Sequence, residues 1–280
     1  MLSKIKKTNE FDINDIIISL RNMPFENYNC GNKRIEFVFE SERATNCVNL
    51  IKEWEIPHID YNCSSMFAII KLMKWFKYKF DLERNINDSN GIESLIDTMK
   101  HNELYEMMKK KQAIFIPKFE ALFFNYILVA SGFKSRLVEC MPIGFIDNNR
   151  YYVVEVYFED YNKWVTVDIC NNSVYYDKNH IPINLIEIRK CITDNREFFV
   201  FSNNDKIETS LFNMWATFLF RLKYCLNNEI DFLTKKTVAY GILTPKLISG
   251  HDKMVDGIDL NQKIIYLYSS SVKDFYDIPV

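Results

Sequence analysis

The chain has 280 residues, of which 48% are hydrophobic, including 22 Phe and 16 Tyr. This length and composition allow one large domain or two small ones with a packed core, and they exclude a largely disordered chain. The formal net charge of −2 gives no broad electrostatic attraction to nucleic acid or to an anionic membrane, so we expect neither as a partner.

The sequence predicts neither export nor membrane insertion. Met1–Lys7 is positively charged, but the apolar region of a signal peptide does not follow it. No run reaches the ~20 apolar residues that are needed to span a bilayer. The seven cysteines are irregularly spaced and include no C-x-x-C pair, which argues against a zinc site or a disulfide framework. We therefore expect a cytoplasmic protein without a metal or a cofactor.

Apolar residues at helical spacing, together with capping residues, predict the helices of the first half of the chain. Turn-forming residues gather at Glu83–Gly91, which predicts either a loop between helices or a domain boundary. The predicted elements are helices at Ile13–Leu20, Ser41–Trp54, from Ser64 or Ser65 onward, and at Ile92–Lys109, with a strand at Arg34–Phe39.

The central helix is expected to begin at Pro117, because proline suits the first turn, and to end at Ser131 with Gly132 as a left-handed stop. Almost every residue from Ala121 to Ala130 is apolar, so this helix should be buried on nearly all sides. Helices followed by an antiparallel meander predict the α+β class. The later predicted elements are strands at Arg136–Ile143, Tyr151–Phe158, Lys163–Ile169, Ile183–Ile188 and Phe198–Phe201, a helix at Leu211–Leu226 and a strand at Ile264–Tyr268.

Three short motifs follow the helix that is predicted from Pro117 to Ser131. They are Gly132-Phe133-Lys134-Ser135-Arg136, Cys140-Met141-Pro142, and Glu155-Val156-Tyr157 followed by Asn162-Lys163-Trp164. Taken together they resemble the bacterial transglutaminase-like superfamily of clostridial and bacillar type. The resemblance implies a papain-like core over residues 41–172, in which a buried central helix packs on an antiparallel sheet beside additional N-terminal helices. It also implies a single domain over residues 1–280, with residues 1–40 and 173–280 as elaborations.

The same resemblance places the catalytic positions of the family on this chain. The family carries Cys-Arg at a helix N-terminus, His at the start of one strand and Asp at the end of the next. Aligned through the motifs, the Cys falls on Pro117, the Arg on Lys118 and the His on Tyr151, and the Asp is retained as Asp168. Pro117 offers no nucleophile, and a phenol with an ordinary pKa of about 10 is a poor base at neutral pH. The resemblance thus implies the fold without cysteine acyl transfer at this site.

Two cysteines outside that alignment are candidate nucleophiles. Cys63 precedes an expected helix N-terminus, where a helix dipole lowers the pKa of a thiol. Cys170 lies two residues beyond Asp168, and both cysteines are also consistent with small apolar core residues. No histidine begins a predicted strand that leads through a turn to an Asp, and no pair of histidines has metal-ligand spacing. The histidines are His58, His101, His180 and His251.

The leading hypothesis is a catalytically lapsed transglutaminase-like protein. It would bind a peptide, an acylated carrier or a protein partner in the former active-site groove. The alternative is an active acyl- or amide-forming enzyme of a biosynthetic pathway that uses Cys63 or another relocated nucleophile. A third interpretation is an interaction scaffold alone. In the leading hypothesis Tyr151 donates a hydrogen bond to Asp168, because a hydroxyl can replace the ring N–H of a histidine.

Overall fold

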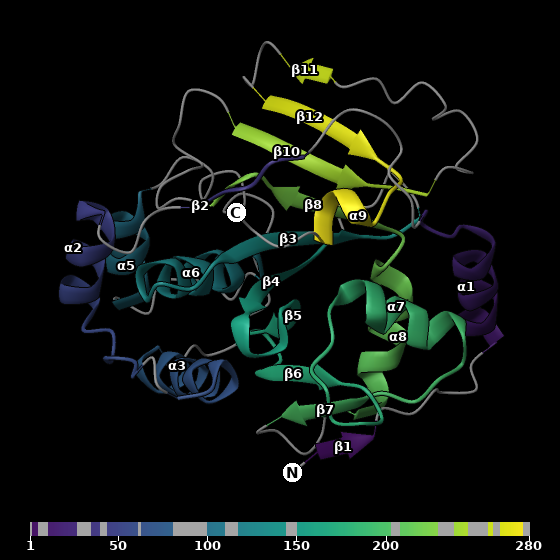
Figure 1. Cartoon of the computed structure of the whole chain (residues 1–280), viewed down its shortest axis with the longest axis horizontal. Coiled ribbons are helices and arrows are strands. Elements are labelled where there is room, and N and C mark those ends of the chain that lie inside the picture. Colours follow the sequence, from purple (N-terminus) through teal and green to yellow (C-terminus); the bar gives the residue numbers. More distant parts are fainter. Residues whose placement is uncertain are drawn as a thin grey trace.

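The computed structural model of this chain describes residues 2–4, 11–26, 35–39, 44–60, 63–80, 100–109, 117–143, 150–202, 208–228, 238–245, 257–259 and 264–276. Its class is α+β, as the sequence predicts, with helices on both sides of a large sheet (Figure 1). The helices are α1 (Phe11–Asn22), α2 (Thr45–Trp54), α3 (Ser65–Lys79), α5 (His101–Lys109), α6 (Pro117–Ala130), α7 (Leu185–Thr193), α8 (Glu208–Phe218) and α9 (Lys273–Tyr276).

One sheet joins strands from near both ends of the chain. The strands are β1 (Leu2–Lys4), β2 (Val38–Phe39), β3 (Ser135–Met141), β4 (Tyr151–Phe158), β5 (Lys163–Asp168), β6 (Ser173–Tyr176), β7 (Phe199–Ser202), β8 (Arg221–Cys225), β9 (Asn227–Asn228), β10 (Val238–Leu243), β11 (Gly257–Asp259) and β12 (Ile264–Ser269). The ten-stranded sheet has the order β1-β7-β6-β5-β4-β3-β8-β10-β12-β11, and β2 pairs separately with β9. Within the large sheet all neighbours are antiparallel except β10 and β12.

The central helix α6 agrees with its prediction at both ends. It begins at Pro117, and Gly132 follows its last turn at φ 82°, in the left-handed region that glycine adopts without steric cost. Every side chain from Phe119 to Ala130 is buried. The helix shares one hydrophobic cluster with α2, α3, α5 and the inner residues of β4 and β5. A second cluster contains residues of α1, α7 and α8, which Figure 1 shows at the other end of the molecule.

A buried ion pair joins β3 to β4. Arg136 Nη2 lies 2.7 Å from Glu155 Oε2, and both side chains are fully buried. Glu155 Oε1 also accepts hydrogen bonds from Leu185 N at the start of α7 (3.1 Å) and from the hydroxyl of Tyr276 in α9 (2.8 Å). Arg136 Nη1 donates to the carbonyl of Phe275. The ion pair therefore links α7 and α9 to the sheet through hydrogen bonds. The guanidinium carbon lies 4.0–4.8 Å from the ring centroids of Trp164, Tyr224, Phe37 and Tyr276.

The strand predicted over Ile183–Ile188 was wrong, because the helix α7 begins at Leu185. The Asn184 side chain accepts a hydrogen bond from Glu187 N, and the Glu187 carboxylate accepts one from Asn184 N, both at 2.9 Å. This reciprocal capping box starts a helix. The alternating apolar residues in this short segment fitted either secondary structure, and the cap decides for the helix.

The helix predicted over Leu211–Leu226 was also too long. The helix α8 ends at Phe218, and β8 follows between β3 and β10. In β8, Leu222 and Tyr224 belong to the second hydrophobic cluster, whereas Lys223 points to the opposite face and pairs with Glu139 of β3 at 2.9 Å. This alternation of buried and charged residues has the period of a strand.

The other predicted elements are present within a few residues wherever the structure describes them. The predicted break at Glu83–Gly91, the start of the helix predicted from Ser41 and residues 92–99 of the helix predicted over Ile92–Lys109 lie outside the described residues. The strands β1, β6, β9, β10 and β11 and the short helix α9 were not predicted. Among the described residues, no helix combines the length and the apolar character needed to cross a membrane. The single domain over residues 1–280 stays a prediction.

Candidate functional site

Asp168 lies in a buried cluster of hydrogen bonds at the end of β5. Asp168 is fully buried, and each of its two carboxylate oxygens accepts two hydrogen bonds. Oδ1 accepts from the hydroxyl of Tyr151 (2.8 Å) and from Asn171 N (3.0 Å). Oδ2 accepts from the hydroxyl of Tyr175 (2.8 Å) and from Asn171 Nδ2 (2.9 Å). We call these four residues the Asp168 cluster.

Neighbouring strands of the sheet position this cluster. Tyr151 is the first residue of β4 and Asp168 the last residue of β5, and the antiparallel pairing of the two strands brings these ends together. Tyr175 comes from β6, the next strand in the sheet. Trp215 of α8 lies edge-on to the rings of both tyrosines, at 5.7 Å from Tyr151 and 5.3 Å from Tyr175. The cluster is therefore enclosed between the sheet and α8.

A hydrogen bond joins Pro117 to Cys170, which lies two residues beyond Asp168. The thiol of Cys170 donates to the carbonyl of Pro117, with 3.6 Å between sulfur and oxygen. Val167, which precedes Asp168 in β5, belongs to the hydrophobic cluster of α6, so the alternation along the strand turns Asp168 toward the opposite face. The structure thus places Tyr151 and Asp168 in direct contact, and it brings the N-terminus of α6 to Cys170.

Burial and neighbouring carboxylates keep the Tyr151 hydroxyl and the Cys170 thiol protonated. Burial raises the pKa of the Tyr151 hydroxyl well above its ordinary value, and the charge of Asp168 adds to this effect. Burial also raises the pKa of the Cys170 thiol well above its ordinary value, helped by Glu120 and Asp168. Glu120 lies in the first turn of α6, is buried and pairs with Lys77 at 3.1 Å. The Cys170 thiol, which contacts the N-terminus of α6, is therefore protonated at neutral pH.

The second candidate nucleophile, Cys63, lies directly before α3 and is partly exposed. Its thiol donates to the carbonyl of Asp60, with 2.7 Å between sulfur and oxygen. The N-terminus of α3 already has an anionic partner, because Ser65 N and Ser65 Oγ donate to the carboxylate of Asp160 at 2.8 and 2.6 Å. The side chain of Ser64 caps the same turn by accepting from Phe67 N at 3.4 Å. The Asp160 carboxylate and the Ser64 hydroxyl therefore occupy this helix end.

The histidines that the structure describes have other surroundings. His58 is exposed, and its carbonyl accepts from Lys71 Nζ at 2.9 Å. The ring of His101 lies 6.3 Å from that of Trp54, and the ring of His180 lies 6.0 Å from that of Phe199. His251 lies outside the described residues. Within the part of the chain that the structure describes, no group of three or more His, Cys, Asp and Glu residues is arranged to hold a metal ion.

Neither Tyr175 nor Asn171 was predicted from the sequence. Tyr175 lies on β6, which was not predicted, although the pairing of Asp168 with Ser173 places Tyr175 two residues further on the same face. Asn171 follows Asp168 by three residues, in the tight turn between β5 and β6. The available signal was this short hairpin, whose turn residues Asn171 and Asn172 favour a reversal of the chain.

No family model, no curated protein and no solved structure matches this chain. The transglutaminase-like resemblance therefore depends on the quoted motifs alone.

Proposed function

We propose that this chain is a non-catalytic transglutaminase-like protein with a papain-like fold, which binds a peptide, a carrier-bound acyl group or a protein partner at the former active site. The hydrogen bond from Tyr151 to Asp168 carries the proposal. In the superfamily the corresponding aspartate orients a histidine, and here its partner is a phenol. The buried helix α6 on an antiparallel part of the sheet supports the proposed fold.

Cysteine acyl transfer needs a thiolate and a base that shares its proton. The phenol of Tyr151 keeps its proton because its pKa is raised by burial and by Asp168. The thiol of Cys170 keeps its proton for the same two reasons and because Glu120 lies nearby. With a protonated phenol and a protonated thiol, the former active site would keep a hydrogen bond to the aspartate, as in the superfamily, but would lack a nucleophile and a base.

Cations around Glu139, on the face of the sheet that carries α6, support a binding role for an acidic partner on that side of the former active site. Glu139 pairs with Arg150 Nη1 at 2.6 Å and with Lys223 Nζ at 2.9 Å. Burial acts to raise the pKa of Glu139, but Lys223, Arg150 and Lys118 lower it overall. Three cations thus surround one carboxylate, and two of them adjoin Tyr151 and Pro117 in the sequence. This excess of positive charge favours an anionic ligand.

The second candidate function is an acyl- or amide-forming enzyme with Cys63 as nucleophile. The observation in its favour is that Cys63, unlike the five buried cysteines of the described part, is partly exposed beside a helix N-terminus. The carboxylate of Asp160 at that helix end weighs against it, because it opposes a second negative charge there.

Labelling of thiols separates the two functions. With iodoacetamide below about pH 8, we expect Cys63 to react no faster than a free cysteine peptide, and Cys170 to react only after unfolding, because its thiol is buried and protonated. A glutamine donor peptide should leave no covalent acyl adduct. Mass spectrometry locates the labelled residues, and protein unfolded in guanidinium serves as the control. Rapid labelling of Cys63, or an acyl adduct on it, would establish the enzymatic alternative.

A peptide-binding measurement tests the proposed binding role. Fluorescein-labelled acidic peptides should bind more tightly than basic peptides of equal length, because cations surround Glu139. Together, the charge reversals Lys118→Glu and Arg150→Glu should weaken the binding of acidic peptides roughly tenfold, which corresponds to a loss of about 1.4 kcal/mol in binding free energy. Lys178→Glu, on the exposed turn after β6, is the matched control. Equal binding of acidic and basic peptides, or equal losses in the control, would contradict an acidic partner at this site. Fluorescence polarisation reports the affinities.

A further inference from the structure

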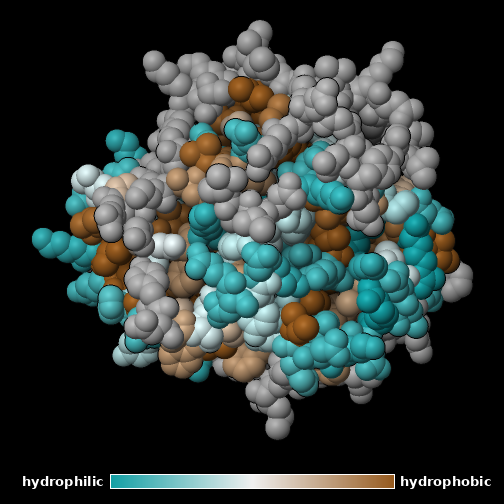
Figure 2. Space-filling view, viewed as in Figure 1, coloured by the Kyte–Doolittle hydropathy of each residue, from teal (hydrophilic) through white to brown (hydrophobic). Residues whose placement is uncertain are grey.

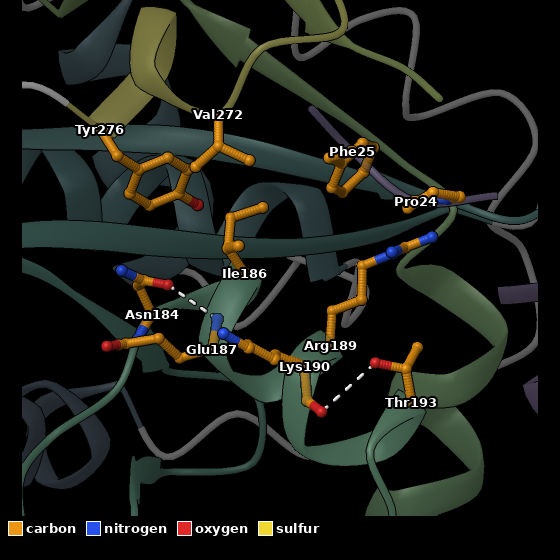
Figure 3. A pocket seen from close by; sticks show the side chains of 10 residues that line it. All are labelled: Pro24, Phe25, Asn184, Ile186, Glu187, Arg189, Lys190, Thr193, Val272 and Tyr276. Carbon is orange, nitrogen blue, oxygen red and sulfur yellow. Dashed lines mark hydrogen bonds between the residues drawn. The ribbon is translucent and has the colours of Figure 1, made fainter. Parts of the chain in front are cut away.

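A cavity of about 370 Å³ opens between the end of α1, the helix α7 and the segment before α9 (Figure 3). Its size falls in the range of small-molecule sites, roughly 300–1,000 Å³. On the face shown in Figure 2, hydrophobic residues form small patches among hydrophilic ones. Three aliphatic side chains and two aromatic rings make up half of the residues that line the cavity. They are Pro24, Phe25, Ile186, Val272 and Tyr276.

One wall of the cavity holds a buried cation, Arg189, which is only 6% exposed. Figure 3 shows its side chain passing beneath Phe25, whose ring centroid lies 4.3 Å from the guanidinium carbon. Nε donates to the carbonyl of Leu219 (2.8 Å), and Nη2 donates to the carbonyls of Leu20 (3.1 Å) and Met23 (2.6 Å). These carbonyls lie at or just beyond the C-terminal ends of α8 and α1, where a helix dipole favours a cation.

Those carbonyls supply partial charges but no counter-ion. Among the described residues, no carboxylate pairs with Arg189, and none accepts a hydrogen bond from its Nη1. Burial lowers the pKa of Arg189 to about 10, so the guanidinium is still charged at neutral pH. A desolvated charge of this kind gains free energy from an anion that reaches it.

The remaining charged residues of the wall leave the cavity positive. Lys190 lies at its rim and is exposed. Glu187 also lines the cavity, but its carboxylate is bound by Lys163 Nζ at 2.6 and 2.7 Å and by Asn184 N at 2.9 Å. Its negative charge is thus already compensated, whereas those of Arg189 and Lys190 have no carboxylate partner among the described residues.

We propose that this cavity binds a small apolar carboxylate. Its hydrocarbon part would contact Phe25, Ile186 and Val272, and its carboxylate would accept a hydrogen bond from Arg189 Nη1, while the exposed ammonium of Lys190 adds positive charge at the rim. An apolar wall with a few placed cations selects this chemistry over a neutral amphiphile, because only an anion compensates the buried charge. The proposal is independent of the function proposed for the Asp168 cluster.

Calorimetric titration with hexanoate and with its neutral isostere hexanamide tests the charge requirement. At low ionic strength we expect saturable binding of hexanoate, and binding of hexanamide that is weaker by about tenfold or more, which corresponds to about 1.4 kcal/mol. Absence of saturable hexanoate binding at any millimolar concentration, or equal affinity for the two compounds, would overturn the proposal.

Two variants test the location without removing the carbonyl contacts of Arg189. Ile186→Trp fills the cavity and should abolish hexanoate binding, and Lys190→Gln should weaken it several-fold. Ile181→Trp, at an exposed position outside the cavity wall, is the matched control and should bind like the wild type. Circular dichroism confirms that each variant is folded. Unchanged hexanoate binding by folded Ile186→Trp would show that the ligand lies elsewhere and would overturn the assignment.

Discussion

The substitution Arg136→Met is expected to lower the free energy of unfolding by about 3–5 kcal/mol, because it leaves Glu155 as a buried carboxylate without its cation. Both side chains are fully buried, so water cannot replace the lost partner. The guanidinium also fills the space between four aromatic rings, and methionine recovers part of that packing but none of the charge. Urea unfolding followed by circular dichroism measures the loss.

The double variant Arg136→Met with Glu155→Gln should be less destabilised than the sum of the two single variants, because it removes the unpaired charge. The matched control is Arg196→Met, which breaks an exposed ion pair with Asp194 and should cost about 0–1 kcal/mol. Equal small losses for Arg136→Met and Arg196→Met would mean that the buried pair contributes no more than a surface pair. Perfect additivity of the two single variants would mean that the charges do not interact.

Periodicity and capping residues predicted the central part of this fold well. The helix α6 was predicted at both ends because Pro117 and Gly132 act through local backbone geometry. The errors at α7 and β8 have a different origin. At α7 the deciding feature is the capping box of Asn184 and Glu187, which lies within the segment, whereas at β8 a neighbour outside the segment favours the strand. In β8 that neighbour is Glu139 of β3, which pairs with Lys223 across the sheet.

The candidate site was predictable only in part, for a related reason. A hydrogen bond between Tyr151 and Asp168 follows from the resemblance, because both positions belong to one motif set. Tyr175 enters through β6, a strand of four residues that is too short to be recognised from its sequence. The cavity beside Arg189 joins α1 to residues more than 160 positions later, and no local pattern reports such a contact.

The substitution Asp168→Asn is expected to lower the free energy of unfolding by roughly 1–3 kcal/mol, because it leaves buried donors without an acceptor. Each carboxylate oxygen accepts two hydrogen bonds, and an amide replaces one of these oxygens with a donor. Tyr151→Phe and Tyr175→Phe should each cost less, since the oxygen that loses a phenol keeps its bond from Asn171. Thermal melts of the three variants beside the wild type measure these differences.

The same melts compare the structural role of Asp168 with a catalytic one. If Asp168 served an active site, Asp168→Asn and Tyr151→Phe would leave the melting temperature nearly unchanged while they abolished function. Ser173→Ala, at the residue paired with Asp168 across β5 and β6, is a nearby control outside the carboxylate contacts. Unchanged melts for both variants of the cluster would reject the structural role.

The pH dependence of the Asp168→Asn effect shows whether burial or hydrogen bonding dominates at this carboxylate. Burial raises the pKa of Asp168 above the ordinary 3.8, although the hydrogen bonds from Asn171, Tyr151 and Tyr175 act to lower it. A group whose pKa is raised by folding contributes stability below its unfolded pKa and loses that contribution as the pH rises through its folded pKa. The difference in unfolding free energy between the wild type and Asp168→Asn should therefore be largest in acid and should shrink as the pH rises above 3.8. Urea unfolding of both proteins across this range measures the difference, and other titrating groups cancel between them. A difference that grows with pH would mean that the hydrogen bonds outweigh burial and that the cluster is built for a charged carboxylate.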